Sequence, residues 1–111
     1  MRSLPKVQTL KQAVKQVIES NKSDGYIPTR FIQATGNGDA PNLLSVCEKL
    51  IVKGETLEYL ENALKRFPIL LTLEDFVVRH GITWGFSGGT VEVAGARVKY
   101  FDLIAGMARY V

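Results

Sequence analysis

Turn-forming residues divide this chain into short segments, and their spacing limits it to short secondary-structure elements. Glycine or proline follows successive apolar segments at Gly25, Gly36, Gly54, Pro68 and Gly81. Glycine adopts the left-handed conformation in which many helices end, and proline interrupts backbone hydrogen bonding. No apolar run approaches the ~18 residues of a membrane-spanning helix. We therefore predict a single compact domain over residues 1–111, with no membrane segment.

Helical spacing of apolar residues is the main pattern before Gly81. For example, Val14, Val17 and Ile18 lie on one face of an amphipathic helix. Similar stripes, with the turn signals between them, predict helices over 7–21, 40–53, 57–67 and 72–80. Asp39 is the expected cap of the second of these helices, and Thr72 with Asp75 resembles a capping box at the start of the last.

The segment 25–36 is ambiguous between helix and strand. Tyr26, Ile27 and Phe31 favour a strand, as β-rich segments often contain such residues. Pro28, however, suits the first turn of a helix, and Gly36 suits the position just after one. We prefer a helix over 28–35, with a strand as the alternative.

The sequence changes character after residue 81. Residues 90–93 and 96–100 are β-branched or alternating, and Ala94-Gly95 between them could form a two-residue turn. Pairing across that turn places Glu92 opposite Arg97. Residues 82–86 would add a third strand, and Asp102 would cap a last helix. The predicted fold is therefore α+β: four to five short helices, then a small C-terminal antiparallel β-hairpin or three-stranded sheet and a short final helix.

A serine-hydrolase motif occurs in this region, since Gly85-Phe86-Ser87-Gly88-Gly89 fits G-x-S-x-G. A nucleophile elbow requires a strand, a sharp turn and then a helix, with the histidine later in the chain. Here a strand is expected after Ser87, and the single histidine, His80, comes before it. We therefore interpret the motif as a turn and predict no catalytic residue and no enzyme activity.

Other chemical motifs are weak. Cys47 is the only cysteine and lies in an apolar helix stripe, so we expect a buried thiol rather than a nucleophile. One cysteine and one histidine are too few for a usual zinc site, and the loop 35–41 lacks the glycines and lysine of phosphate-binding loops. We expect no metal and no cofactor. A single thiol and an N-terminus without an apolar leader segment indicate a cytoplasmic protein.

The net charge of +3 comes from the N-terminal region. Residues 1–24 contain five basic and two acidic side chains, whereas the two signs balance in the remainder. The candidate contacts for an anion or nucleic acid are Lys6, Lys11, Lys15 and Lys22. The order of helices in 7–54 is loosely that of a helix-turn-helix or winged-helix module, although its third helix begins without basic residues.

Aromatic residues gather in the last third of the chain. Trp84, Phe86, Tyr100 and Phe101 form the candidate patch for a protein partner, although packing in the core is the simpler interpretation of such residues. We predict a small non-enzymatic interaction or regulatory domain that binds a protein partner and that could associate with itself. A nucleic-acid-binding module is the alternative.

Overall fold

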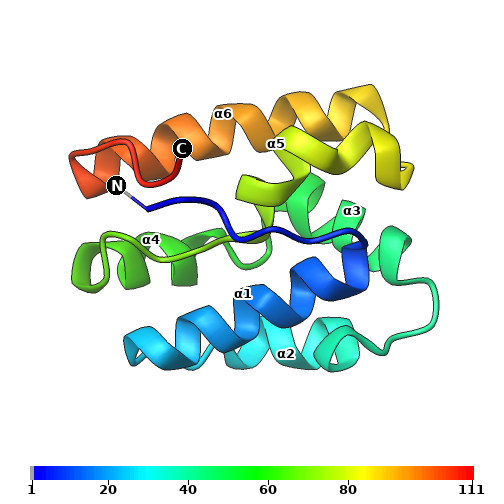
Figure 1. Ribbon diagram of the computed structural model, residues 1–111, viewed down its shortest axis with the longest axis horizontal. Helices are drawn as coiled ribbons and strands as arrows, with labels where there is room; N and C mark the ends of the chain where they lie inside the picture. Colours follow the sequence, from blue (N-terminus) through cyan, green and yellow to red (C-terminus); the bar gives the residue numbers. More distant parts are fainter. Residues whose placement is uncertain (1) are drawn as a thin grey trace.

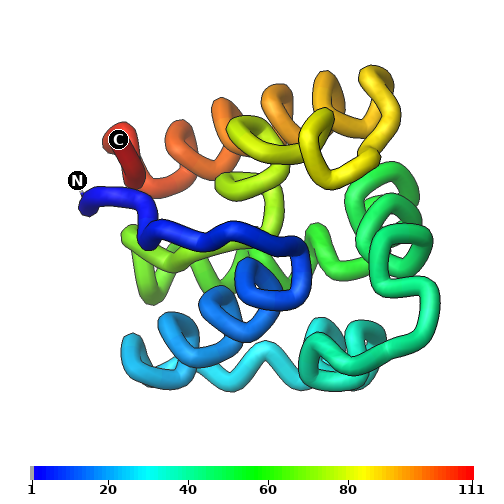
Figure 2. The backbone as a smooth tube through the Cα atoms, turned by 45° about the vertical axis from the view of Figure 1, so that its right-hand side comes forward, coloured from blue at the N-terminus to red at the C-terminus, as the bar shows by residue number. Residues whose placement is uncertain are grey.

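The structure is a computed structural model that describes residues 2–111, and it is helical. The elements are α1 (Leu10–Asp24), α2 (Thr29–Thr35), the 3-10 turn η1 (Gly36–Gly38), α3 (Leu43–Lys53), α4 (Leu57–Arg66), α5 (Leu73–Trp84) and α6 (Gly88–Ala105). Helices α5 and α6 lie together on one side, α1 and α2 lie on the opposite side, and α3 and α4 lie between them (Figure 1). The backbone tube in Figure 2 shows the same arrangement from a second direction.

The predicted α+β fold is wrong, because no strand occurs within residues 2–111. The segment expected to form a hairpin is the continuous helix α6, which also contains Asp102, the expected cap of a final helix. Residues 82–86, expected as a third strand, are the last turn of α5 and the corner that follows it. The third of the chain that looked most β-like is therefore a helical hairpin.

Tertiary packing explains why α6 is a helix. Glycines and β-branched residues favour other conformations, so the helix gains little from local preference. Thr90, Ala94 and Phe101 nevertheless fall on one helical face and are buried. That face packs against α3, α4 and α5. Burial of an apolar face is what stabilises most helices in proteins, and here it outweighs the local sequence.

Gly81 sets the close approach of α5 to α6. A Cβ atom at this position would lie 2.8 Å from Val91 Cγ2 and 3.0 Å from Val77 Cγ1, closer than ordinary packing allows. The expectation that Gly81 ends its helix is wrong, since the helix continues to Trp84. Gly85 ends it instead, with φ of 98°.

The N-terminal half agrees more closely with the sequence. Helix α1 begins after Thr9, whose side chain accepts a hydrogen bond from the Gln12 backbone N–H at 3.2 Å. It ends before Gly25, which has φ of 97°. Helix α2 bears out the helical interpretation of residues 28–35.

Helix α3 begins later than expected, because Asp39 does not cap it. The residue before α3 is Asn42, in the left-handed conformation with φ of 57°. Asp39 instead forms an ion pair with Lys11 at 2.9 Å. The connection between α2 and α3 therefore folds back against α1.

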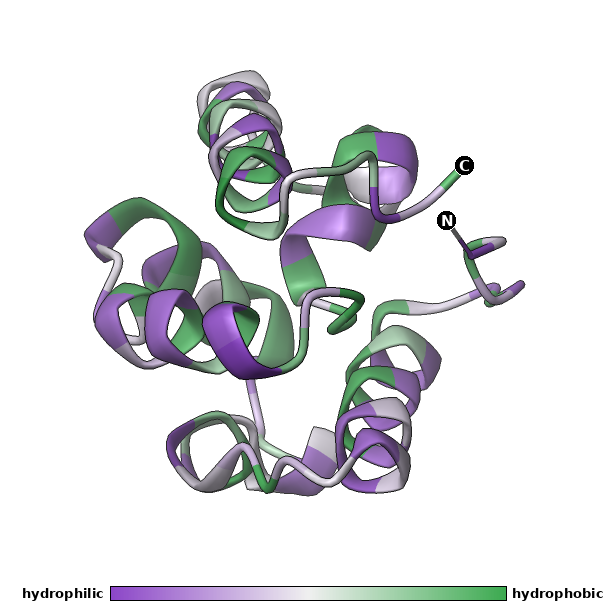
Figure 3. Ribbon diagram, turned by 90° about the vertical axis from the view of Figure 1, so that its left-hand side faces the viewer, coloured by the Kyte–Doolittle hydropathy of each residue, from purple (hydrophilic) through white to green (hydrophobic). Residues whose placement is uncertain are grey.

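Apolar side chains meet in three clusters within the helical layers. The largest joins α1, α3, α5 and α6 around Cys47, Ile51 and Val77. The second joins α1 to α5, and the third joins α4 to the end of α6 around Leu64 and Phe101. Figure 3 colours the ribbon by hydropathy, and hydrophobic and hydrophilic residues alternate along the helices. No helix formed by residues 2–111 is both long and apolar enough to cross a bilayer.

The two ends of the described chain lie side by side (Figure 2). Arg2 and Tyr110 form an isolated parallel β-bridge. The Arg2 backbone N–H donates to the Arg109 carbonyl oxygen at 2.9 Å, and the Val111 N–H donates to the Arg2 carbonyl oxygen at 3.0 Å. The C-terminal segment is thereby held against the N-terminal one.

Candidate functional site

The aromatic residues predicted to bind a partner do not form one surface. Phe86 is 4% exposed and belongs to the large core cluster, and Phe101 is fully buried in the third cluster. Trp84 is half-buried, donates its indole N–H to the Gln8 carbonyl oxygen at 3.1 Å and stacks on His80. Of the four predicted residues, Tyr100 alone is exposed.

Ser87 caps α6 and is held by a carboxylate from α3. Its Oγ lies 2.8 Å from Thr90 Oγ1, which donates to Glu48 Oε2 at 2.9 Å. The Ser87 backbone N–H also donates to Glu48 Oε2, at 3.1 Å. That backbone hydrogen bond is the main reason why the pKa of Glu48 lies below its usual value. The motif is thus a helix cap at a corner between helices, although the predicted strand after it was wrong.

Two of the four candidate lysines already contact a carboxylate. Lys11 and Lys15 approach Asp39 Oδ1 at 2.9 and 3.9 Å. These pairs offset part of the positive charge of α1. Lys6 and Lys22 are exposed.

Cys47 is fully buried among apolar side chains. Burial, with a smaller contribution from the charge of Glu74, raises the pKa of the thiol to about 12. A thiol with this pKa stays protonated and unreactive near neutral pH. No cluster of three or more metal-ligating side chains occurs within residues 2–111.

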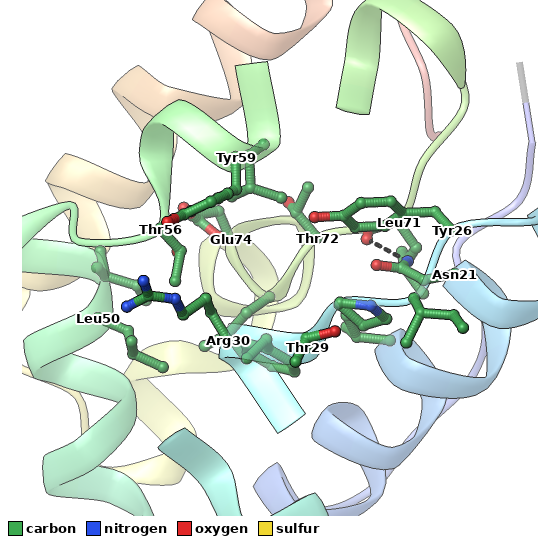
Figure 4. A pocket seen from close by; sticks show the side chains of 17 residues that line it. Asn21, Tyr26, Thr29, Arg30, Leu50, Thr56, Tyr59, Leu71, Thr72 and Glu74 are labelled. Atoms are coloured by element: carbon green, nitrogen blue, oxygen red, sulfur yellow. Dashed lines mark hydrogen bonds between the residues drawn. The ribbon is translucent and has the colours of Figure 1, made fainter. Parts of the chain in front are cut away.

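The feature that best fits a binding site is a pocket that the sequence did not predict. It has a volume of about 320 Å³ and lies among α1, α2, α3, α4 and the start of α5. Figure 4 shows its side chains, with Asn21 and Tyr26 on one side, Thr56 and Tyr59 on another, and Arg30 on a third. Its apolar walls include Val17, Ile27, Phe31, Ile51, Leu60 and Leu71.

Hydrogen bonds within the protein fix two of the polar walls. The Asn21 side-chain amide donates to the Leu71 carbonyl oxygen at 2.9 Å, which ties α1 to the segment before α5. Thr72 donates to Asp75 Oδ2 through both its backbone N–H and its hydroxyl, each at 2.8 Å. The predicted capping box at residues 72–75 is therefore confirmed. This wall of the pocket is rigid because it is also the start of α5.

Glu74 is the buried acid of the pocket. It is 4% exposed, and its ion pair with Arg97 of α6 spans 3.6 Å. Burial raises the pKa of Glu74, although its own backbone N–H and the Arg97 guanidinium favour the ionised form. A buried acid with a raised pKa in a pocket is a frequent sign of a functional site.

Arg30, Tyr59 and Ile27 form the exposed rim of the pocket. The Arg30 guanidinium lies over the Tyr59 ring, 5.3 Å from its centroid, which is a cation–π geometry. Ile27 is 65% exposed and Tyr59 is 45% exposed, so apolar surface continues from the pocket onto the outside of the molecule. Tyr26 lies further in, where burial raises the pKa of its hydroxyl.

A second polar cluster is joined to the pocket wall through Asp75 and Thr72, and it centres on Arg109, which is fully buried. Its guanidinium donates to both oxygens of Asp75, at 2.8 and 3.1 Å, and to Asp102 at 2.9 Å. It also donates to the Leu70 carbonyl oxygen at 2.6 Å. This network fastens the C-terminal segment to the start of α5 and supports the rigid wall described above.

Neither site was predicted from the sequence. The adjacent acids Glu74 and Asp75 fit a helix surface, and neither Arg30 nor Arg109 lies in a recognisable motif. One signal was present: Glu74 falls between Leu73 and Phe76 in an apolar run, where a charged residue needs a partner.

Comparisons with known proteins identify no relative of this chain. The sequence matches no protein-family model, and neither a curated protein nor a solved structure is significantly similar to it.

Proposed function

We propose that this protein is a non-enzymatic interaction domain, and that a segment of a protein partner binds in the pocket between α2 and α4. The observation that carries the proposal is the pocket with its exposed apolar rim at Ile27 and Tyr59. At about 320 Å³ it lies at the small end of ligand-binding cavities. That space suits one large anchoring side chain, and the rim extends the contact to neighbouring residues of the partner.

The charges of α1 and the arrangement of the helices favour a protein partner over a nucleic acid. Lys11 and Lys15 already pair with Asp39, which leaves α1 with less free charge than the sequence suggested. A winged-helix module also requires a β-hairpin, and α6 occupies that part of the chain. The connection between α2 and α3 spans residues 36–42, longer than the tight turn of a helix-turn-helix.

A reducing compartment such as the cytoplasm suits this proposal. Cys47 is a buried thiol that contributes to the largest apolar cluster. Its role is to fill space, and oxidation would place polar oxygen atoms among apolar side chains.

Two tyrosines with similar exposure provide the test. Tyr59 is 45% exposed at the pocket rim, and Tyr100 is 42% exposed on α6, among the residues first proposed for partner binding. Random peptides displayed on phage would be selected against the whole chain, and the dissociation constants of selected peptides measured for Tyr59→Ala and Tyr100→Ala. We expect the first substitution to weaken binding about tenfold or more, as for an interface hot spot, and the second to leave it unchanged.

The opposite pattern would move the interface to α6 and contradict the pocket as its site. Selection of no peptide that depends on Tyr59 would contradict the proposal itself. Light scattering on the same preparation shows whether a second copy of the chain is the partner, since a Tyr59-dependent dimer would identify it.

A further inference from the structure

The pocket carries opposite charges at different depths. The Glu74 carboxylate is buried, whereas Arg30 is exposed at the rim. Other walls of the pocket are apolar or aromatic, including Phe31 and Leu60. A complementary occupant therefore has an apolar body, a group for the carboxylate at its inner end and a negative charge at its outer end.

Glu74 has acceptor capacity to spare for an occupant. Its distance to Arg97, 3.6 Å, is longer than an N–H···O hydrogen bond. The start of α5 does not need it, because the neighbouring Asp75 accepts the capping hydrogen bonds from Thr72. An ionised carboxylate accepts several hydrogen bonds, so a donor that enters the pocket finds an acceptor there.

Arg30 is a cation without an acidic partner in this structure. No ion pair within residues 2–111 joins it to a carboxylate. It is exposed, and its position over the Tyr59 ring holds it at the rim. A carboxylate on a docked segment would meet a guanidinium that is already in place.

We infer that the occupant is an aromatic side chain with a hydrogen-bond donor, tryptophan above all, from a partner segment with an acidic residue beside it. Its donor bonds to Glu74, and the adjacent carboxylate pairs with Arg30. This inference rests on the proposed function and specifies its partner. Buried tryptophan and tyrosine side chains usually find a partner for their N–H or O–H group, and both are frequent anchors of interfaces.

A neutral donor fits the pocket better than a lysine or arginine of the partner. Arg97 already balances the charge of Glu74, so a second cation would lie in the pocket without a free negative charge. Arg30 at the rim would also repel a basic segment on approach. The net charge of +3 on the whole chain favours an acidic partner in the same way.

The test uses a capped peptide, Gly-Asp-Trp-Ser-Gly, titrated into the whole chain and followed by NMR of the backbone amides. Two matched peptides replace Asp by Asn or Trp by Phe. We expect the Asn peptide to bind roughly fivefold more weakly, the upper range for an exposed ion pair. The Phe peptide should bind roughly tenfold more weakly, since it loses a hydrogen bond to a charged acceptor.

Two variants connect these losses to their residues. The Arg30→Gln protein should bind the Asn peptide as tightly as the original peptide, and it should still bind the Phe peptide more weakly. In the Glu74→Gln protein, the loss of affinity of the Phe peptide should fall to roughly threefold, because a neutral acceptor forms a weaker hydrogen bond. Tyr100→Ala serves as the control that changes neither. The peptide comparisons in the unmodified protein stand even if one of the variants folds poorly.

The outcomes separate this inference from the proposed function. Equal binding of all three peptides, or tighter binding when Lys replaces Asp, would overturn the inference. If phage-selected peptides still bind at Tyr59 in that case, the pocket remains the interface. If neither the selected nor the designed peptides shift amide signals around the pocket, both are overturned.

Discussion

Glu74 and Asp75 are adjacent, both buried and both paired with an arginine, yet they do different things. Asp75 accepts two hydrogen bonds from Arg109 and two from Thr72, all between 2.8 and 3.1 Å. Glu74 faces one arginine at 3.6 Å and lines an open pocket. The first carboxylate is saturated by hydrogen bonds within the fold, whereas the second has one longer ion pair and lines the pocket that we propose as the binding site.

The contrast extends to closely packed and open parts of the molecule. Arg109 fastens the C-terminal segment to Asp75, and α5 approaches α6 so closely that a Cβ atom at Gly81 would lie 2.8 Å from Val91 Cγ2. At the pocket that Glu74 lines, the helices leave a cavity with an exposed rim. Changes in the closely packed part should mainly affect stability, and changes at the pocket rim should mainly affect binding.

The largest effect is expected from Arg109→Met. This substitution leaves Asp75 buried without its cation, and breaking a buried ion pair from one side costs about 3–5 kcal/mol of unfolding free energy. Urea denaturation followed by circular dichroism measures it. Arg2→Met serves as the control, since the Arg2 side chain is 46% exposed in its pair with Asp24, and a pair near the surface is worth about 1 kcal/mol or less. Equal losses of unfolding free energy in the two variants would show that the buried Arg109 pair contributes no more than the Arg2 pair does.

Gly81→Ala should have the next largest effect. The added methyl group would overlap Val91 and Val77, and overpacking of this kind costs about 1–3 kcal/mol of unfolding free energy. The higher helix propensity of alanine offsets up to about 1 kcal/mol of this cost. Gly95→Ala is the matched control, since nothing lies within 4 Å of its Cβ position. Thermal denaturation should therefore show a lower midpoint for the first variant and an unchanged or higher one for the second. A stabilised Gly81→Ala would show that the helices can move apart.

Glu74→Gln should change how stability depends on pH. Because burial raises the pKa of Glu74, the folded state holds this proton more tightly than the unfolded state does. As the pH rises from the ordinary value of 4.5 through the folded pKa, ionisation of Glu74 lowers the unfolding free energy of the natural protein. The variant lacks that decrease. Urea midpoints of both proteins at several pH values measure the difference. If the natural protein became more stable relative to the variant as the pH rises over this interval, the prediction would be wrong.

Glu48→Gln should have the smallest effect and the opposite dependence on pH. Hydrogen bonds from Ser87 and Thr90 lower the pKa of Glu48, so its contribution is complete above the ordinary value of 4.5 and is lost as the pH falls through the folded pKa. The variant should lose less stability on acidification than the natural protein does. Glu92→Gln, at an exposed position of α6, is the control. Identical acid profiles for all three proteins would exclude Glu48 as a contributor.

Sequence patterns predicted helices where an apolar face or the residues at the two ends of a segment defined them. For residues 28–35, Pro28 and Gly36 at the ends indicated the helix despite the strand-like composition of the segment. Residues 90–100 were misread because Val91, Glu92 and Val93 alternate like a strand while Thr90, Ala94 and Phe101 repeat like a helix. Only contact with α3, α4 and α5 decides between the two.

The pocket was beyond sequence reasoning for a different reason. Its walls come from five helices, so no local spacing brings Arg30, Tyr59 and Glu74 together. The predicted aromatic patch depended on a C-terminal sheet with Phe86 and Phe101 on or near it, and the helical fold buries both. The lack of a catalytic motif led to the prediction of a binding protein, whereas the position of the pocket depends on the tertiary structure.

The bridge between Arg2 and Tyr110 also determines how the molecule should respond to force. The two segments run parallel, so tension applied to the chain ends pulls them past each other along their length. Both backbone hydrogen bonds then carry the load together, and behind them Arg109 anchors the C-terminal segment to Asp75. A molecule stretched by its ends should therefore resist until this short clamp shears, and only afterwards should the helices unravel.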